Sequence, residues 1–342
     1  MSAREHIIPV FVPHLGCPNN CVFCNQRRIS GQSEAAGAHS VREAIESSAA
    51  LSPKGAKRQM AFYGGSFTAI PAAEQEELLG AAAEYMRRGE ISSIRLSTRP
   101  DAIDDEVTER LKRFGVETVE LGAQSLDDGV LRLSGRGHSA ADVVNAAAKL
   151  KAAGFRVILQ MMTGLPGDSD EKDVETARRI IAMRPDGVRV YPTVIVRDTA
   201  LYDMWKAGKY AEHTVEDAVR VCAKLVPMFE AAGIPIIRLG LNPTEELSSG
   251  AAAGGAYHPA LGELVRSRIM LQKARELLAG TEPGSRVTLG VNAASVSQMT
   301  GQHRSNIGAL RDEFSLSELK VKSCSAAPGE IRVLSVEKPR EI

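Results

Sequence analysis

The sequence predicts an α/β protein whose main part is a partial (βα)6 TIM-like barrel, followed by a small α+β extension. Two observations carry this prediction. Short runs of β-branched residues alternate six times with longer segments of helical period, which is typical of a parallel sheet covered by helices. After the sixth repeat the composition shifts to Ser, Gly and Ala, and a shorter series of strands and helices follows.

The expected barrel strands are short and are bounded by turn residues. They cover residues 7–12, 59–63, 93–97, 117–122, 155–161 and 187–191, and residues 235–239 could add a seventh. Segments of helical period separate them at 41–51, 72–88, from 104 onward, 127–134, 140–153 and 171–183. Six such units favour an open barrel over a closed eightfold one.

Three domains are expected: the barrel at 1–245, a linker or lid with a long helix at 246–284, and an α+β domain at 285–342. The run 248–256 holds only Ser, Gly and Ala, which cannot bury enough side chain to pack, so we expect a flexible loop there. The long helix should cover 259–278. The last domain should contain a strand at 286–291, a helix at 293–313 and strands at 319–322 and 330–333.

Composition limits the classes of partner. Lys plus Arg and Asp plus Glu both number 42, so the overall charge gives no argument for nucleic acid or a membrane surface. No apolar run approaches the ~18 residues that a membrane-spanning helix requires. The amino terminus has no signal-peptide pattern, and five Cys make a poor disulfide framework. We therefore expect a cytoplasmic protein without a membrane partner.

Three of the five cysteines lie within eight residues, with the spacing C-x3-C-x2-C at Cys17, Cys21 and Cys24. Iron–sulfur clusters are usually held by four thiolates, so a set of three leaves one iron open to another ligand. A structural zinc site is the alternative, but zinc prefers closed sets of four Cys and His. Because Cys222 and Cys324 are isolated, the spacing favours an open iron–sulfur site over zinc.

Polar and glycine-containing motifs follow several of the expected strands. The carboxyl ends of parallel strands meet at one edge of the sheet, where ligands bind, so these motifs should border one cavity beside the cysteines. Taken singly, a Gly-Gly-Ser turn or a helix-capping Ser125 has an ordinary structural explanation. The candidate residues are Gly64, Gly65, Ser66, Gln124, Gln160, Gly164, Leu165 and Tyr191.

With Phe23 before the third cysteine, the motif resembles the C-x3-C-x-aromatic-C signature of the radical S-adenosylmethionine (SAM) superfamily. Residues 6–240 are most similar to the radical SAM domain of the Elongator catalytic subunit and its bacterial relatives. The matching segments are 18–26, 63–67, 120–125, 162–167, 191–193 and 201–210. Unlike Elongator subunits, the chain shows no acetyltransferase domain and only two cysteines beyond the triplet, so acetyl transfer is not expected.

The resemblance implies the cofactors and their contacts. Cys17, Cys21 and Cys24 would bind a [4Fe-4S] cluster whose fourth iron binds SAM. Gly64, Gly65 and Ser66 would meet the methionine amino group of SAM, and Gln124 and Gln160 would lie near its ribose or carboxylate. Gly164, Leu165 and Tyr191 would lie near the adenine.

The resemblance also implies the reaction. An external electron donor such as flavodoxin or ferredoxin would reduce the cluster, which would cleave SAM to a 5'-deoxyadenosyl radical that abstracts hydrogen from a substrate. The substrate could be RNA or a small molecule. The alternative is a non-catalytic iron–sulfur or zinc module for redox or binding.

One further segment, residues 300–307 with the sequence Thr-Gly-Gln-His-Arg-Ser-Asn-Ile, is rich in hydrogen-bonding groups. Such groups would suit contact with phosphates or bases. An ordinary amphipathic helix with a polar face is the favoured interpretation.

Overall fold

The computed structural model describes residues 5–12, 21–25, 36–53, 56–243 and 247–338. By their contacts, these residues belong to two compact units. The barrel unit comprises Met1–Ala218 and Leu225–Pro259, and the C-terminal unit comprises Val219–Lys224 and Ala260–Ile342. The three-part division expected from the sequence stays a prediction.

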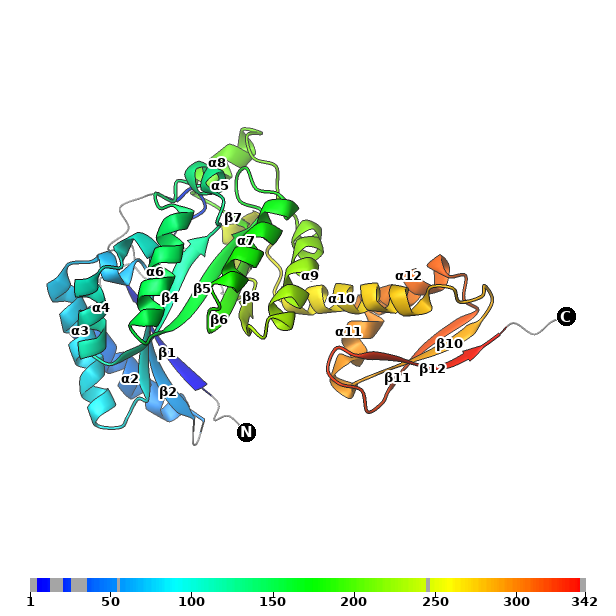
Figure 1. The fold of residues 1–342 in the computed structure, drawn as a ribbon, viewed down its shortest axis with the longest axis horizontal. Coiled ribbons are helices and arrows are strands. Elements are labelled where there is room, and N and C mark those ends of the chain that lie inside the picture. Colours follow the sequence, from blue (N-terminus) through cyan, green and yellow to red (C-terminus); the bar gives the residue numbers. More distant parts are fainter. Residues whose placement is uncertain (1–4, 13–20, 26–35, 54–55, 244–246, 339–342) are drawn as a thin grey trace. The chain divides into compact units, whose positions relative to one another are not determined.

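The barrel unit is built on one parallel sheet in the order β1-β2-β3-β4-β5-β6-β8 (Figure 1). The prediction of an open α/β barrel is therefore confirmed, and the seventh strand that the sequence left open is present as β8. Most residues of the fourth and fifth strands are buried; the fifth strand is accordingly mostly apolar, whereas the fourth also carries buried Glu120 and Gln124. The strands are β1 (Glu5–Val12), β2 (Lys57–Gly64), β3 (Ser93–Thr98), β4 (Val116–Gln124), β5 (Arg156–Thr163), β6 (Gly187–Pro192) and β8 (Ile236–Leu239).

Helices follow the strands and cover the outer face of the sheet (Figure 1). Polar caps determine where several of them begin: Asp104 accepts a hydrogen bond from the Val107 amide at 2.7 Å, and Ser139 and Asp142 form a capping box. The helices are α2 (Ala38–Leu51), α3 (Ala72–Arg87), α4 (Asp105–Arg113), α5 (Asp128–Leu133), α6 (Ala140–Ala152), α7 (Asp170–Ala182), α8 (Ala200–Lys206) and α9 (Val215–Ala231).

The Ser, Gly and Ala run forms regular structure. Residues Leu247–Ala251 make a short helical turn, and Ala252–Gly255 form β9, which pairs antiparallel with β7 (Val194–Val196). A Cβ atom on Gly255 would lie 2.7 Å from the carbonyl oxygen of Thr193, so the close pairing requires glycine there. The expectation of a flexible loop is wrong for β9, because backbone pairing replaces the side-chain burial that the run lacks.

The C-terminal unit packs its helices on one face of a three-stranded sheet. Strand β10 (Arg286–Val291) lies in the centre, parallel to β11 (Glu318–Ser323) and antiparallel to β12 (Ile331–Glu337). Apolar side chains of the sheet and of α10 (Leu261–Leu278), α11 (Val296–Thr300) and α12 (Ser305–Glu313) form a common core. The single helix expected at 293–313 is wrong: Gly301–Arg304 interrupts it, and Gly301, His303 and Arg304 all have positive φ.

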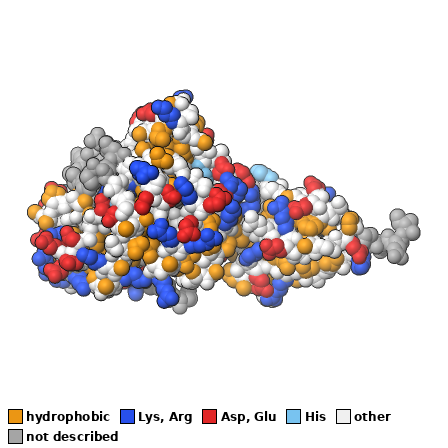
Figure 2. Space-filling model, turned by 45° about the horizontal axis from the view of Figure 1, so that its top comes forward, with side chains coloured by type: hydrophobic (Ala, Val, Ile, Leu, Met, Phe, Trp, Pro, Cys, Tyr) orange, Lys and Arg blue, Asp and Glu red, His pale blue; other side chains and the backbone are white. Residues whose placement is uncertain are grey.

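The described surface is that of an ordinary charged protein. In the face drawn in Figure 2, basic and acidic side chains are interspersed rather than gathered by sign. Among the described residues, none of the helices combines the length and apolar character that crossing a membrane would require.

Candidate active site

A cavity of about 490 Å³ opens at the carboxyl ends of the barrel strands. Strand-end residues of β1 to β6 line it together with the segment that carries Cys21 and Cys24. Nine of the residues singled out from the sequence border this one space: Cys21, Phe23, Cys24, Gly64, Gly65, Ser66, Gln124, Gln160 and Tyr191. Gly164 and Leu165 are not in its lining, and Cys17 lies outside the described residues.

Backbone hydrogen bonds position the segment of Cys21 and Cys24. The Cys24 amide donates to the Cys21 carbonyl at 3.0 Å, which turns both side chains toward the same region. The Val22 amide donates to the carbonyl of Ser134, after α5, and the Leu201 amide of α8 donates to the carbonyl of Val22 at 2.7 Å. Two helices therefore hold the short turn between the thiols.

Phe23 anchors this segment through its ring. The ring is partly buried against Val130, Met162 and Leu165. It also packs against the cluster of Ile195, Leu201 and Tyr210. Phe23 therefore packs the turn between the two cysteines against the barrel, and it also forms part of the cavity wall. Removing the ring would leave the thiols without their packing support.

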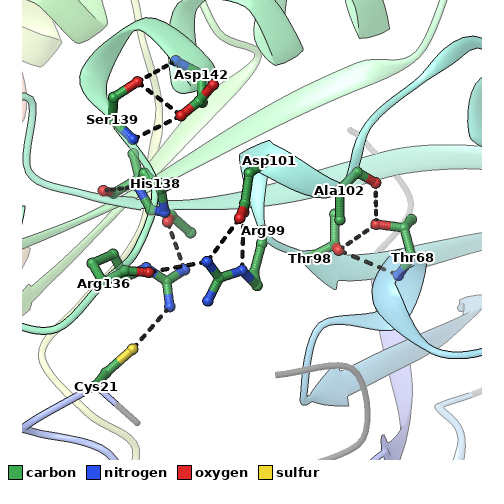
Figure 3. Close-up of polar contacts among 12 residues, drawn as sticks. Cys21, Thr68, Thr98, Arg99, Asp101, Ala102, Arg136, His138, Ser139 and Asp142 are labelled. Atoms are coloured by element: carbon green, nitrogen blue, oxygen red, sulfur yellow. Dashed lines mark hydrogen bonds and ion pairs between the residues drawn. The ribbon is translucent and has the colours of Figure 1, made fainter. Parts of the chain in front are cut away.

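Arg136 reaches the cavity beside Cys21. Its Nη1 lies 3.4 Å from the Sγ of Cys21, and its Nη2 donates to the carbonyl of Gly122 at 2.8 Å (Figure 3). The backbone of Arg136 is fixed in turn, because buried Arg99, paired with Asp101, donates to its carbonyl at 3.0 Å. A guanidinium group stabilises negative charge on a neighbouring sulfur, and the thiolate is the form that binds metals.

Gly122 leaves space for the side chains of Arg136 and Gln124. A Cβ atom at position 122 would lie 2.7 Å from Nη2 of Arg136 and 2.9 Å from Nε2 of Gln124. A side chain at position 122 would displace both groups. Because glycine has no side chain, Arg136 and Gln124 can both approach this strand.

The loop after β2 is held closely to the strand ends. Gly64 has φ 102°, a backbone conformation that favours glycine, and the amide of Gly65 donates to the Val12 carbonyl at 2.8 Å. Thr68 extends the support, since its hydroxyl lies 2.6 Å from that of Thr98 and donates to the Ala102 carbonyl (Figure 3). The Gly-Gly-Ser backbone thus has a fixed orientation at the cavity.

Gln124 and Gln160 lie together at the ends of β4 and β5. The pairing of these strands shifts register between Gly122 and Gln124, and Gln124 has φ 64°. The Nε2 atom of Gln160 donates to the Oε1 of Gln124 at 3.3 Å. The irregularity turns the Gln124 side chain toward the cavity, where two amides present hydrogen-bonding groups side by side.

Gly164 and Leu165 lie outside the cavity lining and contact residues around it. Tyr210 donates from its hydroxyl to the Gly164 carbonyl at 2.6 Å, and Leu165 packs in the apolar cluster that Tyr191 contacts. Contact of these two residues with adenine remains a prediction.

A pair of buried carboxyl groups lies under this turn. Burial and the neighbouring Asp168 raise the pKa of Asp173 to about 10, and burial also raises the pKa of Asp168. Asp168 is the neighbouring charge that adds to the shift of Asp173, and the Gly164 amide donates to Asp173 and opposes the shift. Asp173 therefore keeps its proton near neutral pH, and the Gly164 amide joins its carboxyl group to the backbone of the turn.

A network of buried charges contributes Tyr63, Glu120 and Arg189 to the cavity lining. Glu120 lies between two guanidinium groups: Nη1 of Arg95 donates to its Oε1 at 3.1 Å, and Nη2 of Arg189 donates to the same oxygen at 3.0 Å. The Nε of Arg189 is 2.8 Å from Oε2, close enough for an ion pair although not aligned for a hydrogen bond. Burial raises the pKa of Tyr63 to about 12, with Glu120 adding to the shift, so its phenol is protonated near neutral pH.

Tyr191 presents a directed hydroxyl group to the cavity. Nη1 of Arg189 donates to its Oη at 3.2 Å. Because the phenol oxygen accepts there, its own hydrogen can be given to another acceptor, and Tyr191 is part of the cavity wall. The network thus offers a polarised donor to a molecule bound in the cavity.

The sequence-based reasoning missed Arg95, Arg136 and Arg189. A signal for Arg189 was present, because it is the charged residue of an otherwise apolar strand and must find a partner when buried. Arg95 gave a weaker signal, since its strand also contains Ser and Thr. No pattern in the sequence linked Arg136 to Cys21, which is 115 positions away.

The chain is similar over part of its length to a tRNA uridine(34) acetyltransferase and to an Elongator complex protein 3. It is 36% identical over 129 residues to tRNA uridine(34) acetyltransferase of Methanocaldococcus infernus, covering 37% of this chain and 24% of that protein. It is 30% identical over 179 residues to human Elongator complex protein 3, covering 52% of this chain and 32% of that protein. The chain thus spans about a quarter to a third of the length of these relatives.

The fold also has solved counterparts. The archaeal Methanocaldococcus infernus Elp3 with an N-terminal deletion has a TM-score of 0.63 and 22% identity, and the match covers 83% of this chain and 67% of that one. At this identity the likeness shows a shared fold.

Family models account for most of the chain. The Radical SAM superfamily model matches residues 11–180, which include the cysteine motif and strand ends β1 to β5. The model described as Radical_SAM C-terminal domain matches residues 185–271. The chain is therefore an enzyme that belongs to the radical SAM superfamily.

Proposed function

We propose that the chain binds a [4Fe-4S] cluster through Cys17, Cys21 and Cys24, and binds SAM in the barrel cavity. The observation that carries the proposal is the convergence of Cys21, Cys24 and the other strand-end candidates on one space. The donor set suits the cluster, because its thiols are the ligands that iron–sulfur clusters require and Arg136 stabilises charge on one sulfur. When bound, the cluster and SAM would supply one-electron reductive cleavage and hydrogen-atom abstraction.

The chain's own residues would bind and orient SAM. The fixed Gly64–Gly65 backbone offers carbonyl and amide groups to the methionine end, and Gln124 and Gln160 offer paired amides to the ribose or carboxylate. Phe23 and Met162 give the cavity apolar wall that limits access of water. An external donor such as flavodoxin or ferredoxin would provide the electron, and the protein would act in the cytoplasm.

RNA is the substrate class that the comparisons favour over a small molecule. Its support comes from relatives whose name is tRNA uridine(34) acetyltransferase. Tyr191, whose hydroxyl accepts from Arg189, stays assigned to the adenine end of SAM together with Gly164 and Leu165. Comparison of modified nucleosides in transfer RNA from cells with and without the gene tests this assignment, and unchanged nucleosides would contradict it.

Anaerobic reconstitution tests the cofactors. We expect about four irons per chain and 5'-deoxyadenosine after addition of dithionite and SAM. Cys21→Ala and Cys24→Ala should lose the iron, whereas Cys324→Ala, a matched control in the C-terminal unit, should keep it. One zinc per chain without sulfide would support the non-catalytic alternative instead.

A further inference from the structure

The turn between α11 and α12 presents basic side chains on a fixed backbone. Gly301, His303 and Arg304 have φ values of 76°, 50° and 64°. A Cβ atom at position 301 would lie 2.5 Å from the hydroxyl of Ser305 and 2.9 Å from the amide nitrogen of Asn306, so the turn requires glycine there. The side chains of His303 and Arg304 are exposed.

Asn306 fixes this turn to the rest of the C-terminal unit. Its side chain is buried, and its Nδ2 donates to the carbonyl and hydroxyl oxygens of Ser267 in α10, both at 3.0 Å. The same group donates to the Gln298 carbonyl in α11 at 3.1 Å. Three helices therefore meet at one amide, and the turn is held in place rather than left to fray.

A cavity of about 670 Å³ lies beside the turn. Residues of α10 and α11 line one part of it, including apolar Leu264 and Val296 and polar Ser267, and His303 and Arg304 also border it. The carboxylate of Glu263 lines it as well and accepts from the Gln298 amide at 3.2 Å, so the hydrogen-bonding edges of bases, and not phosphates, suit that side. Unpaired bases have apolar faces and hydrogen-bonding edges, so this mixture of groups suits them. The turn adds the guanidinium group of Arg304 where a phosphate backbone would pass.

We propose that this cavity binds single-stranded nucleic acid, with bases in the cavity and phosphates on the turn Gly301–Arg304. Strand β10, helix α11, the turn, helix α12 and strand β11 follow in sequence, and the two strands lie parallel side by side. A glycine-containing G-x-x-G loop is the device by which KH modules clamp the nucleic-acid backbone. Here Arg304 takes the place of the second glycine in a left-handed conformation and adds a guanidinium that can pair with a phosphate.

The local charge agrees with this ligand. Residues 260–342 contain twelve Lys and Arg against nine Asp and Glu, although the whole chain is balanced at 42 of each. The neutral overall charge therefore conceals a basic C-terminal part and a slightly acidic remainder. The site is separate from the cofactor chemistry, and its test needs neither cluster nor SAM.

Fluorescence anisotropy of the full chain with a labelled 12-nucleotide mixed-sequence single-stranded RNA tests the proposal. We expect this strand to bind more tightly than a 12-base-pair RNA duplex, and binding to weaken as salt rises. Arg304→Glu should raise Kd about tenfold. A DNA strand of the same sequence distinguishes the ligand source: weaker binding assigns RNA, and equal binding assigns single strands of either sugar.

Lys322→Glu is the matched control. It makes the same change of charge in the same unit, but on the sheet face opposite the helices, because its neighbour Val321 packs into the core. We expect its Kd to stay within about twofold of the original. Thermal melting shows whether each variant folds, and Gln302→Glu, at another exposed turn position, repeats the test if Arg304→Glu does not.

Three results would overturn the proposal: no binding of single strands at low salt, tighter binding of the duplex, or equal weakening by Arg304→Glu and Lys322→Glu. Failure of the cofactor proposal looks different, since SAM cleavage would be absent while strand binding persisted. Conversely, if the enzyme is active but binds no single-stranded nucleic acid, only the proposal of this binding site is contradicted.

Discussion

Glu120→Gln should strongly destabilise the barrel unit. Glu120 is the carboxylate between Arg95 and Arg189, with N–O distances of 2.8 to 3.1 Å, and the side chains of Arg95 and Glu120 are only 4% and 3% exposed. The amide keeps the shape of the side chain but removes its charge. Two buried guanidinium groups then lie together without the carboxylate that holds them.

The magnitude follows from burial. Removing one partner of a buried ion pair costs about 3 to 5 kcal/mol, because it leaves an uncompensated charge. Arg95→Met should cost less, since Glu120 keeps Arg189 as a partner. Glu117→Gln, on the same strand, removes a pair with Arg156 whose side chains are nearly half exposed and 3.9 Å apart, so it should cost less than about 1 kcal/mol.

Urea denaturation followed by tryptophan fluorescence measures these differences. Trp205 is the only tryptophan in the chain and lies in α8 of the barrel unit, so its emission reports unfolding of that unit. The expected order of stability loss is Glu120→Gln, then Arg95→Met, then Glu117→Gln. If Glu120→Gln cost no more than Glu117→Gln, the network would not hold the cavity wall as described.

Three further predictions concern other parts of the barrel unit. Arg136→Gln should weaken retention of iron in reconstituted protein about tenfold or more in chelator titrations, because the cation beside Cys21 is lost; the exposed Arg132→Gln should not change it. Asp173 has a pKa raised from 3.8 to about 10, so the folded state keeps a proton that the unfolded state releases, and stability falls as pH rises between these values. Asp173→Asn should therefore gain Tm relative to the original chain from pH 5 to 9, and a constant difference would contradict the raised pKa. Gly255→Val should lower Tm by several degrees, because its side chain collides with the backbone of β7; an unchanged Tm would show that the pairing can open freely.

The strands and strand-end motifs could be predicted because their signals are local. Apolar runs such as 59–63 mark buried strands, and parallel topology then brings the residues after them to one edge. For this reason Gln124, Gln160 and Tyr191 could be assigned to a common cavity before their positions were known.

The features that escaped prediction depend on contacts distant in sequence or on single backbone angles. The β7–β9 pair joins segments more than fifty residues apart, and the β9 residues carry almost no side-chain signal. The apolar period of residues 293–313 continues across Gly301, so only the observed φ values reveal the turn. The contact of Arg136 with Cys21 likewise depends on the three-dimensional path of the chain.

Gly122 has a consequence for how the cavity can change. A single methyl group at this position would meet Arg136 and Gln124 at once, although one lies by the cysteines and the other pairs with Gln160. A substitution at position 122 therefore changes both ends of the cavity at once, whereas a substitution of Gln124 or of Arg136 acts on one end. A library for new specificity should therefore keep glycine at this position.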